Sequence, residues 1–202
     1  MSDPAGGLRK RMEPILARAK QGEAFRVRAA RTSDVSSIAR MNRAVVEAGE
    51  GVVLAAADLE PLSEQEARLR ESVNNMRGTA GAFLVAEWCS APGIIASSGI
   101  WRLGPTLLKH VALLSLEVHP REQGKGVGRR VFERALEWAV SPLARVEPRV
   151  ERLELYVRQD NTRARALYDS LGFVVESRRE RFVRTEQGLY VDDLIMVRWS
   201  DG

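Results

Sequence analysis

The order of apolar runs and helical patterns along the chain predicts an α/β fold in a single domain. These segments follow one another as one strand, two helices, three strands, a helix, a strand, a helix and two strands. The 202 residues suit one domain, and 45% of them are apolar, which is ample for a core. From Leu113 to Glu137 a buried strand leads through a glycine-rich loop into a helix. That central arrangement is typical of a ligand site.

Residues 1–24 are predicted to be an N-terminal extension, and residues 25–202 a single domain. The extension opens with Gly and Pro residues, and its basic part, Leu8 to Lys20, is interrupted by Pro14. A nucleic-acid-binding or partner-binding arm is the alternative interpretation, but no aromatic residues interleave the charges.

The first elements of the domain are a strand, Phe25 to Ala29, and two helices. The Thr-Ser-Asp sequence at residues 32–34 offers N-caps for a helix that Gly49 and Gly51 break. The spacing of Ser63-x-x-Glu66 is that of a capping box, and it predicts a second helix through about Met76.

Three strands follow these helices. Gly81 to Trp88 and Ile94 to Arg102 are predicted strands joined by a turn at Pro92-Gly93. Val111 to Val118 is an apolar run long enough for a fully buried strand and too short for a typical helix, and Pro120 stops it.

Alternating glycines follow the third strand and precede a helical pattern. Gly124, Gly126 and Gly128 let the backbone adopt positive φ and come close to a ligand. The first turn of the helix leaves N–H groups unpaired, and these groups together with the helix dipole bind phosphate. We therefore expect a phosphorylated ligand here.

The residue spacing in this segment does not match that of two well-known phosphate-binding loops. A Walker loop needs Ser or Thr after its Gly-Lys, but Gly126 follows Lys125. A dinucleotide loop needs a third glycine where Arg129 stands. The pattern Gln-x-x-Gly-x-Gly, with Gln123, Gly126 and Gly128, resembles the pyrophosphate-binding loop of the GNAT superfamily of acyl-CoA-dependent N-acyltransferases. A plain tight turn before a helix would use the same glycines.

A second motif supports the resemblance. After a predicted strand, Val150 to Val157, residues 160–173 resemble a further GNAT segment, in which an Asn opens a short helix before Ala, Leu-Tyr and Gly-Phe. The matching residues are Asn161, Ala164, Leu167, Tyr168, Gly172 and Phe173. The resemblance covers roughly residues 25 to 199. It implies a central mixed, mostly antiparallel sheet with helices on both faces.

The resemblance also implies a site for acetyl-CoA as cosubstrate. In GNAT proteins the strand before the glycine loop and the strand after the next helix splay apart, and the pantetheine arm lies between them. The backbone of Val118 would contact this arm near the thioester, and Asn161 would cap its helix and bond the arm, although capping alone is an alternative role. The implied cofactor-binding residues are Val118, Gln123, Gly124, Lys125, Gly126, Val127, Gly128, Arg129 and Asn161.

Two side chains are catalytic candidates. In the family, the tyrosine that matches Tyr168 protonates the departing coenzyme A thiolate; an ordinary core aromatic is the alternative. Glu117 is the one acidic residue in its apolar strand and lies beside the expected thioester, so it is a candidate base, unless it is merely a charge at a strand end. Many relatives carry a carboxylate where Leu113 stands. His119, His110 and an ordered water rank lower as bases.

The resemblance implies direct acetyl transfer to a primary amine in a ternary complex. A lysine-type amine has a pKa near 10.4, whereas an α-amine titrates at about 7.7–8.0 and needs only a weak base. The preferred acceptor is a small molecule such as an amino acid or a polyamine, and Tyr190 and Asp192 of the last strand are candidates to meet it. A protein N-terminal or lysine acetyltransferase and a non-catalytic acyl-CoA-binding module are the alternatives.

The composition of the chain sets expectations for disulfides, membrane segments, metals and partners. Cys89 is the single cysteine, so no intramolecular disulfide forms and a reducing compartment is expected. No stretch is long and apolar enough to span a membrane, and the N-terminus lacks a signal-peptide core, so we expect a soluble cytoplasmic protein with no membrane partner. With two histidines and no ligand spacing, no metal is expected. The net charge of +4 gives no reason to expect a nucleic-acid partner; similar proteins often form homodimers.

Overall fold

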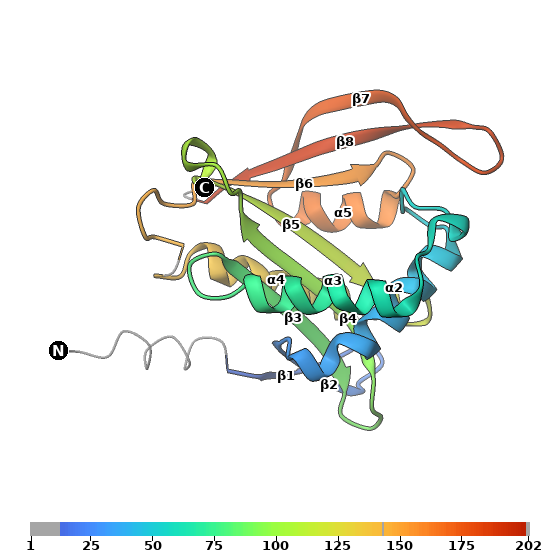
Figure 1. Cartoon of the computed structure of the whole chain (residues 1–202), viewed down its shortest axis with the longest axis horizontal. Helices are drawn as coiled ribbons and strands as arrows, with labels where there is room; N and C mark the ends of the chain where they lie inside the picture. Colours follow the sequence, from blue (N-terminus) through green and yellow to red (C-terminus); the bar gives the residue numbers. More distant parts are fainter. Residues whose placement is uncertain (1–12, 143, 201–202) are drawn as a thin grey trace.

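The structure, a computed structural model, describes residues 13–142 and 144–200. Its centre is one eight-stranded sheet in the order β1-β2-β3-β4-β5-β6-β8-β7 (Figure 1). Only β5 and β6 pair in parallel; every other neighbouring pair is antiparallel, as the resemblance implied. The strands are β1 (Ile15–Arg18), β2 (Ala24–Ala29), β3 (Gly81–Trp88), β4 (Ile94–Arg102), β5 (Val111–Val118), β6 (Arg152–Arg158), β7 (Val174–Arg184) and β8 (Tyr190–Trp199).

Helices cover both faces of the sheet. The longer helices are α2 (Val35–Ala48), α3 (Leu62–Asn75), α4 (Val127–Ala139) and α5 (Thr162–Ser170). Helices α2 and α3 bury Val35, Ile38 and Val73 against one face, and α4 buries Val131 and Phe132 against the other, which α5 also joins. In Figure 1, α2 and α3 lie in front of the sheet and α4 lies behind it.

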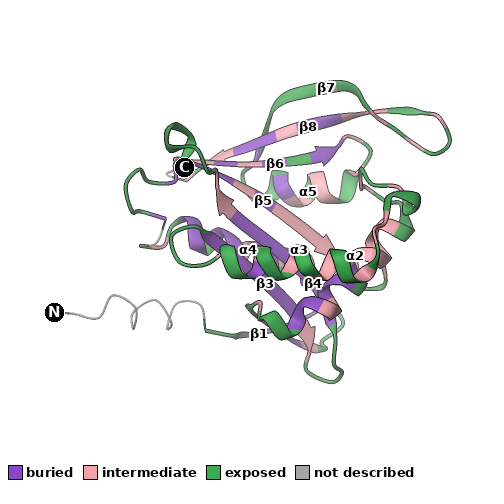
Figure 2. Cartoon of the chain, in the orientation of Figure 1, coloured by how far each residue is buried: buried purple, intermediate pink, exposed green. Residues whose placement is uncertain are grey.

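The central strands are buried on both faces, which explains their apolar runs. Along β3, Leu84 and Ala86 belong to the cluster under α4, whereas Phe83 and Val85 belong to the cluster under α2 and α3. Figure 2 shows β3 and β4 as largely buried and β7, at the edge of the sheet, as largely exposed. These two strands therefore form part of the buried centre of the sheet.

The predicted boundary after residue 24 cuts through the sheet. Strand β1 lies within the expected extension and pairs with β2, with Ile15 opposite Val27 and Arg18 opposite Ala24. Ala17 and Ala19 are buried in the larger core cluster. Residues 13–24 are thus part of the folded domain, and the first part of the expected extension, residues 1–12, lies outside the described residues.

The predicted capping box at Ser63 and Glu66 is wrong. Helix α3 begins at Leu62, and the residue that caps it is Pro61, whose carbonyl accepts from the Glu64 and Gln65 N–H groups at 3.0 and 3.2 Å. Proline holds φ near the value that a helix entry needs, so the helix starts before Ser63. The end predicted for the preceding helix is confirmed, since Gly49 closes α2 with φ +68°.

Asp34 has a different role from a simple helix cap. Its carboxylate accepts from the Arg31 N–H at 2.7 Å and thereby closes the short 3₁₀ turn Thr32–Asp34 that leads into α2. The same carboxylate takes two bonds from the buried Arg28 guanidinium, which also bonds Glu87 of β3. These ion pairs hold the start of α2 on the sheet and keep the pKa values of Asp34 and Glu87 below their usual range.

Candidate active site

A gap opens in the sheet where β5 and β6 part. The two strands pair only from Val111–Leu113 to Arg152–Glu154, although β5 continues to Val118 and β6 to Arg158. The last residues of β6 stay attached to β8 on the other side, as far as Arg158 opposite Asp193. The β6-facing edge of β5 is therefore unpaired from residue 114 onward, as expected from the resemblance.

The glycine loop lies at the open end of this gap. After the 3₁₀ turn Pro120–Glu122, Gly124 and Gly126 have φ of +76° and +87°, and Val127 begins α4. The first turn of α4 leaves its backbone N–H groups without partners in the helix and available to an anion. The positive φ expected for these two glycines is confirmed.

Gly128 serves packing rather than backbone freedom. It lies inside the first turn of α4, and a Cβ there would be 2.9 Å from Val118 Cγ2 on β5. The missing side chain lets the helix start close to the strand end. It also brings the N-terminus of α4 beside Val118, the residue expected to contact the thioester.

Other side chains of the loop bond to protein neighbours. Lys125 Nζ is 2.8 Å from Glu122 Oε2 and 5.7 Å from the Trp88 ring centroid. The Gln123 amide oxygen accepts from Arg163 of α5, and Arg129 donates to the Ser170 hydroxyl. Backbone N–H groups are consequently the more accessible donors of this loop.

Asn161 opens α5 as the sequence predicted. Its Oδ1 accepts from the Ala164 N–H at 3.1 Å. The loop after α2 presses against the same side chain, because a Cβ on Gly51 would lie 2.1 Å from Asn161 Nδ2. Arg158 donates to the Val52 carbonyl at 2.7 Å and pairs with Asp160, so it ties that loop to the corner between β6 and α5. Sequence reasoning missed this contact and treated Gly51 only as a helix breaker.

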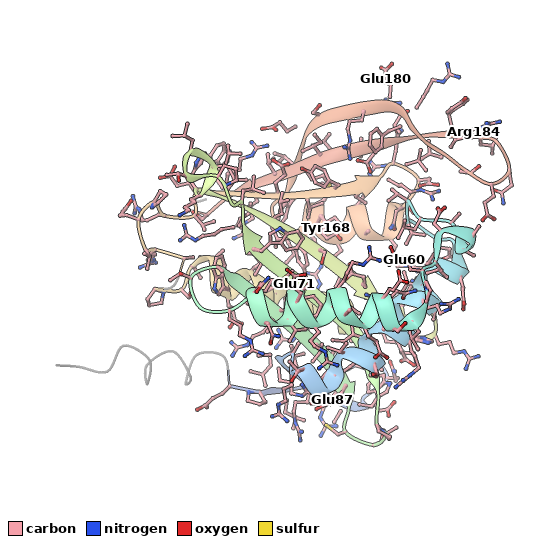
Figure 3. The ribbon with its side chains drawn as sticks, in the orientation of Figure 1. Glu60, Glu71, Glu87, Tyr168, Glu180 and Arg184 are labelled. Atoms are coloured by element: carbon pink, nitrogen blue, oxygen red, sulfur yellow. The ribbon has the colours of Figure 1, made fainter. Side chains whose placement is uncertain are left out.

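Tyr168 projects from α5 into the interior of the molecule (Figure 3). Its ring packs against Phe132 of α4, with centroids 5.2 Å apart, and against Phe173 at 6.1 Å. No described residue bonds its hydroxyl, which leaves the phenol proton available. Burial raises the pKa of Tyr168 above its ordinary value of 10, and the nearby charge of Glu117 raises it further.

Glu117 lies on the α2 face of β5, opposite Ser97 of β4. Part of the residue remains accessible, yet its carboxyl is desolvated, and this raises the pKa of Glu117 to about 7. The Ser97 hydroxyl donates to Glu117 Oε2 at 3.1 Å, and bonds from Ser97 and Ser115 oppose part of the rise. Glu117 lies on the part of β5 that has no pairing with β6, and Tyr168 is near enough for the charge of Glu117 to raise its pKa.

The lower-ranked candidates lie elsewhere or have other roles. His119 Nδ1 accepts from the Arg121 N–H at 3.2 Å and so caps a turn. His110 precedes β5, at the opposite end of the strand from Glu117. Asp192 pairs with Arg178 and accepts from the Arg181 N–H at 2.6 Å.

The final hairpin overhangs the same end of the sheet. Strands β7 and β8 continue past the last residue of β6 as a two-stranded ribbon. There the Arg181 guanidinium lies 4.2 Å from the ring centroid of the exposed Tyr190. Tyr190 and Asp192 lie on β8 in this ribbon, and both contact arginines.

The described residues contain neither a metal-binding cluster nor a membrane-spanning helix. No group of three or more His, Cys, Asp or Glu side chains in residues 13–142 and 144–200 is arranged to hold a metal ion. In the same part of the chain, no helix has the length and apolar character needed to cross a membrane.

The fold and the gap define an acyltransferase architecture, and comparison with known families agrees. The family model described as the acetyltransferase (GNAT) family matches residues 53–173, which contain both motifs and the two catalytic candidates. The chain belongs to the GNAT acetyltransferase family.

Known relatives show how far the similarity reaches. The chain is 38% identical over 93 residues to mycothiol acetyltransferase from Beutenbergia cavernae, a match that covers 46% of this chain and 25% of that protein. It is 34% identical over 91 residues to the N-alpha-acetyltransferase RimI of Mycobacterium tuberculosis, covering 45% of this chain and 52% of the relative. The matches thus span about half or less of these relatives.

A solved structure matches over most of the chain. The yncA protein of Salmonella typhimurium, determined with its cofactor acetyl-CoA, superposes with a TM-score of 0.71. The match covers 88% of this chain and 95% of that one, at 19% identity. At this identity the comparison establishes the fold alone.

Proposed function

We propose that this protein is an acetyl-CoA-dependent N-acetyltransferase that acts directly, in a ternary complex, on the α-amino group of a small molecule or a peptide. The observation that carries the proposal is the pair formed by Glu117 and Tyr168 at the gap between β5 and β6, with the pKa of Glu117 raised to about 7. A base and an acid on opposite sides of one gap suit the two proton movements of acyl transfer.

The cofactor side of the gap fits coenzyme A. The backbone N–H groups from Gln123 to Arg129 lie at the start of α4, where phosphate binds favourably. The free edge of β5 up to Val118 offers backbone groups to the pantetheine arm, and Asn161 lies across the gap. Acetyl-CoA supplies the activated acetyl group as a thioester.

Glu117 is the base in this scheme. It accepts a proton from the acceptor ammonium, so the amine becomes a nucleophile. Transfer from an α-ammonium with a pKa of about 7.7–8.0 to a carboxylate with a pKa of about 7 costs ~1 kcal/mol. Transfer from a lysine-type ammonium near 10.4 costs ~4.6 kcal/mol. This difference favours an α-amine over a lysine side chain or a polyamine.

Tyr168 is the acid. Because its pKa is raised, the phenol stays protonated and can donate throughout the working pH range. It donates a hydrogen bond to the sulfur as the thiolate leaves and transfers its proton to it. The second proton that the nitrogen loses as the amide forms returns Tyr168 to the phenol, and Glu117 releases its proton to solvent. Desolvation raises the pKa of the phenol, and it also raises the pKa of a thiol in the same place. The difference between the two pKa values is therefore changed less than either value, and the phenol can still protonate the thiolate.

The name of one relative supports an α-amino acceptor, since that protein is an N-alpha-acetyltransferase. The other relative is named for acetylation of mycothiol. The size of the acceptor separates two versions of the proposal, an enclosed small-molecule site and an open site for a peptide end.

The test is coenzyme A release from acetyl-CoA with a panel of amino acids, polyamines and short peptides. Wild type and Tyr168→Phe are compared, together with peptides whose only free amine is either the α-amine or a lysine. We expect turnover with α-amines and a loss of about 10²-fold in kcat for Tyr168→Phe. Turnover that Tyr168→Phe leaves unchanged contradicts the acid role. Acetyl-CoA binding without turnover on any acceptor of the panel leaves two interpretations, a binding module or an acceptor outside the panel.

A further inference from the structure

The turn between β1 and β2 lies against the glycine loop. The backbone N–H of Lys20, in this turn, donates to the Lys125 carbonyl at 3.0 Å. This bond joins the N-terminal hairpin to the loop at residues 123–126. The family model begins at residue 53, so the hairpin lies outside the matched region.

The turn holds its shape through its own bonds. The Ala19 N–H donates to the Glu23 carbonyl and the Gly22 N–H to the Ala19 carbonyl, both at 2.9 Å. Arg18 Nη1 donates to the Gly22 carbonyl, also at 2.9 Å, and Gly22 takes the φ of +91° that the turn needs. Lys20 therefore lies in a hydrogen-bonded turn and not in a free chain end.

The Lys20 side chain runs over the start of α4. Its Cγ lies 3.8 Å from the position that a Cβ on Gly126 would occupy, and Gly126 is the residue that caps α4. The ammonium group is three bonds further along an exposed side chain. No ion pair involves Lys20 among the described residues, whereas Lys125 is paired with Glu122.

We propose that Lys20 binds a phosphate group of the acyl-CoA, so that the β1–β2 hairpin is part of the cofactor site. This inference rests on the proposed function. Lys20 adds a mobile positive charge to the partial positive charge of the α4 N-terminus, and both attract the same anion. Lys125 and Arg129 are already engaged with Glu122, Glu133 and Ser170, so of these three cations Lys20 has the least competition from protein groups.

Calorimetric titration of coenzyme A tests the proposal directly. Wild type, Lys20→Ala and Lys20→Arg are compared with Lys109→Ala, which removes the same charge from an exposed position beyond the other end of β5. We expect coenzyme A to bind Lys20→Ala about 5–10-fold more weakly at low salt, with the difference shrinking as salt screens it. Lys20→Arg restores most of the affinity, and Lys109→Ala binds as wild type does.

Dephospho-coenzyme A identifies which phosphate Lys20 contacts. If the loss seen with Lys20→Ala disappears with this ligand, the contact is to the 3′-phosphate; if the loss persists, the contact is to the pyrophosphate. Either result supports the proposal.

Two results overturn the proposal in distinguishable ways. If wild type and Lys20→Ala bind coenzyme A equally, or Lys109→Ala is weakened as much as Lys20→Ala, the role of Lys20 fails and the proposed function stands. If wild type does not bind coenzyme A, the proposed function fails as well. Melting temperatures of all four proteins, which we expect to agree, separate lost binding from lost folding.

Discussion

The two sides of the gap between β5 and β6 are built in different ways. The cofactor side comes mainly from one continuous segment, in which β5 runs through the glycine loop into α4. In the proposed function, the acceptor side is assembled from parts far apart in the sequence, namely the loop after α2 and the overhanging ribbon of β7 and β8.

The chemistry of the two sides differs accordingly. The cofactor side presents backbone N–H groups, which nearly every residue carries. The sequence therefore shows this side only through the glycines that shape the loop and through their spacing. The acceptor side presents side chains held by long-range contacts, such as Arg158 on the Val52 carbonyl. Binding of acetyl-CoA and recognition of the amine should therefore respond to different substitutions.

The largest expected effect is on the cofactor side. Gly126→Val places a β-branched residue at φ +87°, which costs about 1–3 kcal/mol, and adds bulk where the phosphate approaches. We expect acetyl-CoA to lose its ability to raise the melting temperature. Gly78→Val is the matched control, since Gly78 has φ +62°, open space around it and a place at the opposite end of the sheet. Equal binding losses in both variants would mean that strain alone is responsible.

Glu117→Gln should separate catalysis from cofactor binding. We expect kcat to fall by about 10²–10⁴-fold while the affinity for acetyl-CoA is unchanged. Because Glu117 must be ionised to accept a proton, wild-type kcat/KM should rise as pH increases through about 7, and the variant should lack this rise. A pH profile that is the same in both proteins contradicts the assignment of the base.

The same substitution has an independent effect on stability. The pKa of Glu117 is higher in the folded protein than in the unfolded chain, so its contribution is favourable at low pH and lost as pH rises through about 7. At pH 8 the ionised carboxylate is desolvated. Glu117→Gln should therefore melt at a higher temperature than wild type at pH 8, with a smaller difference at pH 5, as measured by calorimetry.

A smaller effect is expected on the acceptor side. Gly51→Ala puts a Cβ 2.1 Å from Asn161 Nδ2, so either the loop after α2 or the Asn161 side chain must move. We expect the KM of the acceptor to rise about 5–10-fold, on the order of 1–1.4 kcal/mol. Gly49→Ala carries nearly the same strain, with φ +68° against +70°, but nothing lies within 4 Å of the new Cβ. If both variants raise the KM of the acceptor equally, the contact with Asn161 does not shape the acceptor side.

The smallest effect is a shift in the pH profile. Ser97→Ala removes a bond that lowers the pKa of Glu117, so the rise of kcat/KM should move to higher pH. Ser98→Ala is the matched control, because its hydroxyl donates instead to the Ser115 carbonyl at 2.8 Å. An equal shift in both variants would point to a general loosening of β4.

The sequence by itself determined the central elements and the cofactor loop. The predicted bounds of β3, β4 and β5 agree with the structure, because these strands are buried and end at turn residues, so that apolar runs and breaks mark them in the sequence. The GNAT resemblance of the glycine loop and of the segment at Asn161 followed from residues close together in the chain.

Only the tertiary structure decided how distant segments meet. The pairing of β1 with β2, the position of Lys20 over Gly126 and the contact of Gly51 with Asn161 leave no periodic signal in the sequence. The raised pKa of Glu117 likewise depends on burial by neighbouring strands, which a single strand does not encode. Local sequence patterns reflect the backbone conformation and burial pattern of single segments. Desolvation and long-range contacts arise only when the chain is packed.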